Sequence, residues 1–230
     1  MRVDHHRAAY WLAACFVLTL ATFYFWPELD LTTSALFYRE GERFWLSDIE
    51  AVQILRETVW GFSIAAFLVA IFALGMAALK RPLPDFGARP AAFVFLLYLL
   101  GPILLVNAVL KNHWGRARPG SIAEFGGTRE FTPPWLPADE CARNCSFVSG
   151  EGSAAVALAI TFLILAPLAR RFLPRVLLAI YAAAAIAFPV AGLVLRVATG
   201  RHFLSDTIFA ALFVLMIALV LHRLILTERR

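Results

Sequence analysis

The sequence contains few charged residues, since only 16% of its 230 residues are Asp, Glu, Lys or Arg. Hydrophobic residues make up 61% of the chain and the mean hydropathy is +0.74, values well beyond the averages of soluble globular domains. This composition excludes an ordinary soluble enzyme. It indicates an integral membrane protein.

Other features are missing as well. The chain has no basic stripe interleaved with aromatic residues, so its net charge of +5 does not predict nucleic-acid binding. Its polar clusters, described below, lack grouped carboxylates or histidines of the kind that hold magnesium or zinc, so we expect no metal and no other cofactor. Internal repeats and low-complexity tracts are absent too. The whole chain, 1–230, is therefore predicted to be a single membrane domain.

Only three cysteines are present, and two of them share the long loop 112–148. Cys141 and Cys145 are four residues apart, a spacing compatible with a disulfide in an oxidising compartment and equally with two free thiols in a packed loop. A zinc site is disfavoured, because the loop holds a single histidine, His113, and no second cysteine pair.

Six stretches are long and apolar enough to span a bilayer as helices. The predicted spans are 8–26, 58–79, 91–110, 152–169, 176–195 and 203–222. The predicted fold is therefore all-α, a bundle of six transmembrane helices.

The placement of cations between these spans predicts the orientation, because cytoplasmic loops are enriched in Lys and Arg. One side would hold 11 of the 21 cations but only three acids, Asp4, Asp85 and Glu228. Its cations are Arg2, Arg7, Lys80, Arg81, Arg89, Arg170, Arg171, Arg175, Arg223, Arg229 and Arg230. Both termini are therefore predicted to be cytoplasmic.

Three short polar clusters then fall on the opposite, outer side. The first cluster is 111–119 (KNHWGRARP), the second is 149–151 (SGE) and the third is 196–206 (RVATGRHFLSD). Ionisable residues at membrane depth are costly and usually functional. Three such clusters on one face predict a composite site.

The third cluster supplies a candidate nucleophile. His202 and Asp206 are four residues apart, so on a helix they share a face, and the carboxylate can hold the imidazole in one tautomer. A histidine that merely caps a helix is the alternative, but Arg196 and the other two clusters favour a catalytic His202.

The other two clusters fit an anion. Lys111, Arg116 and Arg118 could neutralise phosphate oxygens, although headgroup anchors at a helix end would have the same composition. Ser149 and Gly150 enter the fourth span, where free backbone N–H groups attract anions, but Ser149 could equally be an ordinary N-cap.

In their order and spacing, the three clusters resemble the signatures of the type 2 phosphatidic-acid phosphatase superfamily, K-x6-R-P, P-S-G-H and S-R-x5-H-x3-D. The resemblance implies a metal-independent phosphohistidine mechanism in which His202 attacks phosphorus and Asp206 supports it. It also implies a set of residues that hold the phosphate. These are Lys111, Arg118 and Arg196, with the backbone around Ser149 and Gly150.

The chain departs from these signatures at Val148, Leu195 and, above all, Glu151, which stands where the family has a histidine that protonates the leaving group. Glu151 is the candidate general acid. His113 could supply the proton instead, with Arg116 as a further supporting residue, or an acidic leaving group could need little help. A structural Glu151 would pair with Arg116 or Arg118.

The predicted function is hydrolysis of a phosphorylated membrane lipid at the periplasmic face of a bacterial inner membrane. Lipid A, phosphatidylglycerophosphate, phosphatidic acid and undecaprenyl diphosphate are the candidate substrates that the resemblance implies, with lipid A first because the outer loop could shape a saccharide pocket. The alternatives are a degenerate phospholipid-binding or transport protein and a lipid phosphotransferase. The sequence does not indicate an oligomeric state.

Overall fold

The computed structural model describes residues 4–41, 43–84 and 86–227. Five charged residues used in the orientation argument lie outside this part of the chain. They are Arg2, Asp85, Glu228, Arg229 and Arg230.

Six helical runs are long and apolar enough to cross a membrane, which confirms the predicted all-α, six-span fold. They are α1 (His5–Phe25), α3 (Glu50–Ala78), the run of α4 (Ala88–Tyr98), η1 (Leu99–Leu110) and α5 (Lys111–His113), α6 (Gly150–Phe172), α7 (Arg175–Ala198), and α8 (Leu204–Leu221) with η4 (His222–Leu226). The largest difference from the prediction is at α3, which begins eight residues before position 58. Gln53, Arg56 and Glu57 interrupt the apolar pattern there without ending the helix.

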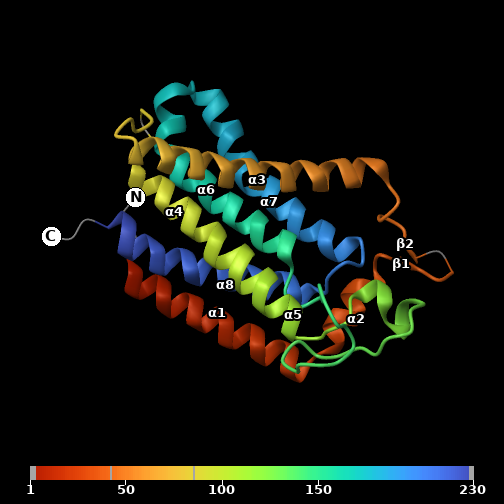
Figure 1. The fold of residues 1–230 in the computed structure, drawn as a ribbon. Coiled ribbons are helices and arrows are strands. Elements are labelled where there is room, and N and C mark those ends of the chain that lie inside the picture. Colours follow the sequence, from red (N-terminus) through yellow and green to blue (C-terminus); the bar gives the residue numbers. More distant parts are fainter. Residues whose placement is uncertain (1–3, 42, 85, 228–230) are drawn as a thin grey trace.

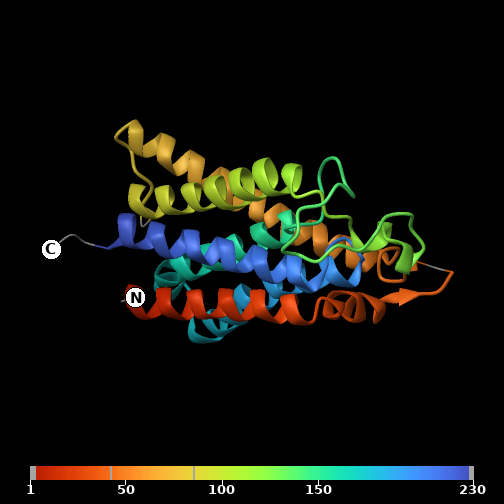
Figure 2. The same cartoon turned by 90° about the horizontal axis from the view of Figure 1, so that it is seen from below.

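The long helices lie alongside one another, and both ends of the chain lie at the same end of the bundle (Figures 1 and 2). An even number of spans requires this arrangement. The short elements and the long loop gather at the opposite end (Figure 1). These short elements are α2 (Glu28–Ala35), β1 (Tyr38–Arg39), β2 (Arg43–Phe44), η2 (Pro119–Ser121) and η3 (Ala123–Phe125).

The core of the bundle is built around α6. Its first turns bury small residues such as Ser153, Ala154 and Ala155, which allow neighbouring helices to approach closely. Phe93 and Leu97 of α4 and Val214 of α8 pack in the same apolar cluster. Large apolar side chains on the outside, such as Leu68 on α3, are exposed, as expected for lipid contact.

The third span changes its helical form part-way along. Leu99–Leu110 is a π-helix that contains Pro102, and Asn107 donates a hydrogen bond from its side-chain amide to the Pro102 carbonyl at 2.7 Å. Proline lacks a backbone N–H, so it leaves a carbonyl of the preceding turn without its usual donor. The helical run nevertheless continues into Lys111, the first residue of α5 and of the first cluster.

Candidate active site

The three clusters meet at one end of the bundle. The first cluster follows the third span, the second begins α6, and the third joins α7 to α8. Lys111, Arg196 and His202 are all buried, with 5%, 3% and 3% of their surfaces exposed. Cations buried this deeply need an anionic partner, and a bound phosphate would supply one.

His202 is held by a backbone carbonyl. Its Nδ1 lies 2.7 Å from the carbonyl oxygen of Ser146 and 3.7 Å from Oδ2 of Asp206. Since a carbonyl oxygen only accepts, Nδ1 carries the hydrogen and Nε2 keeps its lone pair. Burial lowers the pKa of His202 to about 4; the nearby Asp206 opposes this shift and the charge of Lys111 adds to it. The ring is thus neutral at physiological pH, as a nucleophile must be.

Asp206 acts on His202 through Ser146. The Ser146 hydroxyl donates to Oδ2 of Asp206 at 2.5 Å, while the Ser146 carbonyl accepts from the imidazole. The same carboxylate oxygen accepts the backbone N–H of Phe203 at 2.9 Å, at the start of α8. The spacing of His202 and Asp206 predicted that these two side chains lie together. Ser146 was not identified, because its position in the sequence does not distinguish it from other serines in loops.

Arg116 lies in a fully buried ion network with two carboxylates. Its guanidinium is 2.7 Å from Oδ1 of Asp206 and 2.8 Å from Oδ2 of Asp30, and its Nε donates to the Thr132 carbonyl at 2.8 Å. It also lies 4.2 Å from the centre of the Phe203 ring. These contacts occupy the guanidinium, so Arg116 supports α8 and not a bound phosphate.

Asp30, from α2, was not identified from the sequence. Its Oδ1 accepts the Ser205 backbone N–H at 2.8 Å and its Oδ2 accepts the Ser205 hydroxyl at 2.5 Å. Asp30 therefore joins α2 to the first turn of α8. The partners are 175 residues apart, and no local pattern indicates such a contact.

Within the residues that the structure describes, Lys111 and Arg118 form no ion pair, whereas Arg196 pairs with the carboxylate of Glu151. Arg118 donates to the Asn144 carbonyl at 2.8 Å, and burial together with the nearby Arg201 lowers its pKa. Arg196 donates to the Thr199 hydroxyl at 3.2 Å, and its buried Nε has no hydrogen-bond partner.

A disulfide joins Cys141 and Cys145 in the adjoining loop. The sequence had left open the choice between this bond and two free thiols. The Cys145 backbone N–H donates to the Lys111 carbonyl at 3.0 Å. The disulfide-closed turn therefore packs directly on the start of the first cluster.

The N-terminus of α6 has the features of an anion site. Ser149 is the N-cap, and its hydroxyl accepts the Gly152 N–H at 3.1 Å. The amides of Gly150 and Glu151 have no acceptor within the helix. A Cβ at Gly150 would lie 2.8 Å from Oδ1 of Asn107, so any larger residue there would have to displace the Asn107 side chain.

Glu151 forms ion pairs at the edge of the site. Its Oε2 lies 2.5 Å from Nη1 of Arg196 and 3.6 Å from Nε of Arg56. These partners differ from Arg116 and Arg118, which the sequence had suggested. Arg56 was missed because it stands outside the three clusters, beside Glu57 in the early turns of α3.

His113, the other candidate acid, is exposed at the end of α5. Its Nδ1 bonds the Val109 carbonyl of the same helical run at 2.7 Å. The buried cluster around His202 does not include it.

The profile of the PAP2 superfamily matches residues 91–230, a range that contains all three clusters. The chain belongs to the PAP2 superfamily. This membership confirms the resemblance to the type 2 phosphatidic-acid phosphatases.

Similar proteins extend the likeness to more than nine-tenths of the chain. A lipid A 4'-phosphatase of Francisella tularensis subsp. novicida is 30% identical over 221 residues, 95% of each chain. A lipid A 4'-phosphatase of Rhizobium leguminosarum is 31% identical over 91% of each chain, and one of Rhizobium etli is 40% identical over 51% of this chain and 46% of its own. No solved structure matches the chain. The protein is a membrane lipid phosphatase.

The residues around the site do not resemble a metal centre. Within 4–41, 43–84 and 86–227, no group of three or more His, Cys, Asp or Glu side chains could hold a metal ion. Cations and backbone amides surround His202 instead, which suits a bound phosphate.

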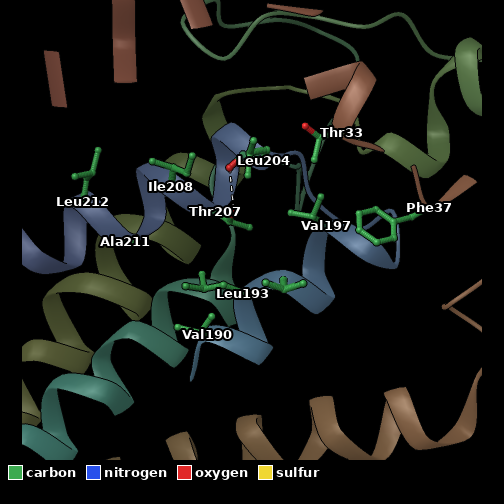
Figure 3. Close-up of a pocket in the computed structure, with 11 residues that line it drawn as sticks. Thr33, Phe37, Val190, Leu193, Val197, Leu204, Thr207, Ile208, Ala211 and Leu212 are labelled. Carbon is green, nitrogen blue, oxygen red and sulfur yellow. Dashed lines mark hydrogen bonds between the residues drawn. The ribbon is translucent and has the colours of Figure 1, made fainter. Parts of the chain in front are cut away.

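An apolar pocket of about 420 Å³ lies beside the third cluster in this PAP2 phosphatase (Figure 3). Its walls come from α7 and α8, and Phe37 and Thr33 close one side. Val197 and Leu204 line it, and they flank the turn that carries His202. Two lining residues are therefore close in sequence to the site, since Val197 follows Arg196 and Leu204 is two residues after His202.

Proposed function

We propose that this phosphatase hydrolyses a phosphomonoester of lipid A through a phosphohistidine at His202, at the periplasmic face of a bacterial inner membrane. The supporting observation is the neutral, buried imidazole of His202, whose Nδ1 is bonded to Ser146 and whose Nε2 is free to attack. Two relatives that match more than nine-tenths of the chain are named lipid A 4'-phosphatases, which favours this substrate.

The mechanism follows from the site. Nε2 of His202 attacks phosphorus and the bond between phosphorus and the ester oxygen breaks. Lys111, Arg118, Arg196 and the amides at the start of α6 hold the phosphate oxygens as charge redistributes over them. Water then attacks the phosphohistidine, releasing inorganic phosphate and restoring the imidazole.

The departing alkoxide must gain a proton. Oε2 of Glu151 is engaged by the guanidinium of Arg196, whereas a general acid must present a proton to the leaving oxygen. We therefore assign Glu151 to positioning Arg196 against the phosphate. The proton then comes from water at the mouth of the site.

The apolar pocket suits an acyl chain of the same lipid. It is lined almost wholly by aliphatic side chains of α7 and α8, and it lies next to the turn that carries His202 (Figure 3). A lipid whose acyl chain lies in this pocket would hold its headgroup at the three clusters. Burial of apolar surface would then contribute to positioning the reacting phosphate.

Release of inorganic phosphate by the detergent-purified protein tests the proposal. Lipid A, phosphatidic acid, phosphatidylglycerophosphate and undecaprenyl diphosphate would be compared, with and without EDTA, and with His202→Ala as the blank. We expect the highest kcat/KM for lipid A and no loss with EDTA. If another lipid were preferred, that lipid would become the proposed substrate. If EDTA stopped turnover, the metal-independent mechanism would be wrong. Binding without phosphate release would indicate the degenerate pocket, and phosphate recovered on a second lipid would indicate a transferase.

The proposed orientation has a separate test. Single cysteines would be introduced into a variant without the native cysteines, and whole cells would be treated with a membrane-impermeant thiol reagent. Position 135 in the outer loop should react and position 172 at the end of α6 should not. The reverse pattern would place the site in the cytoplasm.

A further inference from the structure

A second cavity, of about 360 Å³, opens beside the phosphate cluster, by which we mean Lys111, Arg118, Arg196 and His202. Its lining is mostly polar, whereas that of the pocket in Figure 3 is apolar. Among the residues that the structure describes, three arginines and no carboxylate line this arginine cavity. The lining residues are Arg43, Phe44, Ser47, Arg118, Gly120, Ser121, Phe125, Gly126, Thr199, Gly200 and Arg201. Arg118 is shared with the phosphate cluster, so the two sites are neighbours.

The positive charge of the arginine cavity is not balanced by protein groups. In the ranges that the structure describes, neither Arg43 nor Arg201 forms an ion pair with an acidic side chain. Arg118 bonds a neutral carbonyl, and Arg201 lies close enough to Arg118 for the two charges to repel. Like charges that converge on one hollow without a counter-charge favour an anionic ligand.

The walls of the arginine cavity are fixed by close packing. The Gly120 N–H donates to the Gly200 carbonyl at 3.0 Å, which ties η2 to the turn after α7. A Cβ at Gly200 would lie 2.3 Å from the Phe44 ring, and the φ of Gly200 is +64°, so this turn requires glycine on both counts. Phe44 in turn stacks edge-on against Phe125. The arginines therefore project from a framework that is already ordered.

The position of the arginine cavity limits what its ligand can be. Arg201 directly precedes His202, and Arg118 belongs to both sites. A group bound here would be attached to the same molecule as the phosphate at His202. The serine and threonine hydroxyls in the lining add hydrogen-bond donors for further oxygens.

We propose that the arginine cavity binds a second anionic group, a phosphate or a carboxylate, on the headgroup whose first phosphate is hydrolysed at His202. This inference rests on the proposed function, and it names the substrate class as headgroups that carry two acidic groups. Arg43 and Arg201 then determine specificity, while Arg118 contacts both anions. A lipid with one acidic group would leave the cavity without an anion.

Matched lipids test the inference. Bisphosphorylated lipid A would be compared with a monophosphorylated form that keeps the hydrolysed phosphate and has the same acyl chains. We expect the wild type to prefer the bisphosphorylated lipid in kcat/KM, mainly through KM. Arg201→Gln and Arg43→Gln should each reduce this preference about tenfold, the low end for a charge-assisted hydrogen bond. Arg143 is an exposed arginine of the loop 112–148 that does not line the cavity, so Arg143→Gln should leave the preference unchanged.

A binding measurement separates the inference from the proposed function. The inactive His202→Ala protein would be titrated with the two lipids, with and without Arg201→Gln, and the affinity ratio recorded. A preference for the bisphosphorylated lipid that depends on Arg201 would support the cavity even if the wild type hydrolyses another lipid. Equal affinity for both lipids would overturn it, as would losses in Arg201→Gln that are the same for both. A lipid A analogue with a carboxylate in place of the second phosphate identifies which anion is preferred.

Discussion

Glu151 Oε2 lies 2.5 Å from Nη1 of Arg196, which joins the second cluster to the third. We expect Glu151→Gln to lower kcat/KM by about tenfold, because the amide keeps the shape of the side chain but loses the charge that orients Arg196. The loss should be the same for lipid substrates and for p-nitrophenyl phosphate, whose leaving group needs no proton. Phosphate release and p-nitrophenolate absorbance would be measured in parallel.

The alternative role has a distinct signature. A general acid at Glu151 would make the loss on the lipid roughly 10²-fold or more, and the activated ester would be almost unaffected. Arg56→Gln is the matched comparison, since it removes the more distant partner of Glu151 and leaves the carboxyl group in place. The positioning role predicts that Arg56→Gln changes both substrates to the same, smaller extent.

His202→Ala should abolish turnover, with a loss of roughly 10⁴-fold or more, because no other group can form the covalent intermediate. Quenching into alkaline denaturant during turnover of ³²P-labelled lipid should trap label on the wild type and none on the variant. A phosphohistidine is labile to acid, so rapid quench and alkaline gels are needed. His6→Ala, in the first turns of α1, serves as the control for loss of a histidine. Label that survives in His202→Ala would place the nucleophile elsewhere.

His202 should become protonated only at a pH well below that at which an ordinary histidine does. Burial lowers its pKa to about 4, below the ordinary value near 6.5, so the ring should stay neutral from pH 8 down to about pH 5. The unfolded chain takes up this proton first as pH falls below 6.5. Stability is therefore full above that pH and declines towards pH 4. Nitrogen NMR of ¹⁵N-histidine protein, assigned with His202→Gln, would give the value directly. Titration near 6.5 would contradict a buried imidazole.

Arg116→Met should destabilise the protein by about 3–5 kcal/mol, because it leaves Asp30 and Asp206 buried without their counter-charge. The midpoint of thermal unfolding in detergent would measure the loss. Arg118→Met provides the contrast, since Arg118 bonds only a carbonyl and should affect turnover more than stability. Adding Asp30→Asn to Arg116→Met should recover part of the stability, because it removes one of the two uncompensated charges. Equal midpoints for the two arginine variants would argue against a structural Arg116.

The sequence could predict the features that have a local pattern. Six apolar runs gave six spans, and the spacings around Lys111, Arg118, Arg196, His202 and Asp206 identified residues that the fold brings to one end of the bundle. Length and hydropathy act within single segments, so they can be read without knowledge of the packing.

The features that were missed depend on contacts between distant segments. Asp30 and Arg56 look like ordinary charges at the ends of apolar runs, and only the folded bundle brings them to Arg116 and Glu151. Ser146 was missed for a similar reason. It is the backbone carbonyl of Ser146 that accepts the hydrogen bond from His202, and every residue has such a carbonyl. The start of α3 was placed too late because polar residues on an interfacial turn resemble a loop.

The bond between Asp30 and Ser205 joins residues that are synthesised far apart in time. Asp30 is translated soon after the first span, yet its partner Ser205 and the nucleophile His202 come after five of the six spans have been made. A ribosome that stalls before this point leaves an inserted bundle whose buried Arg116 and Asp30 lack Asp206 and Ser205. Such a chain has no His202, and its buried charges lack their partners. Completion of the last helix is thus the step that turns an inserted polypeptide into a phosphatase.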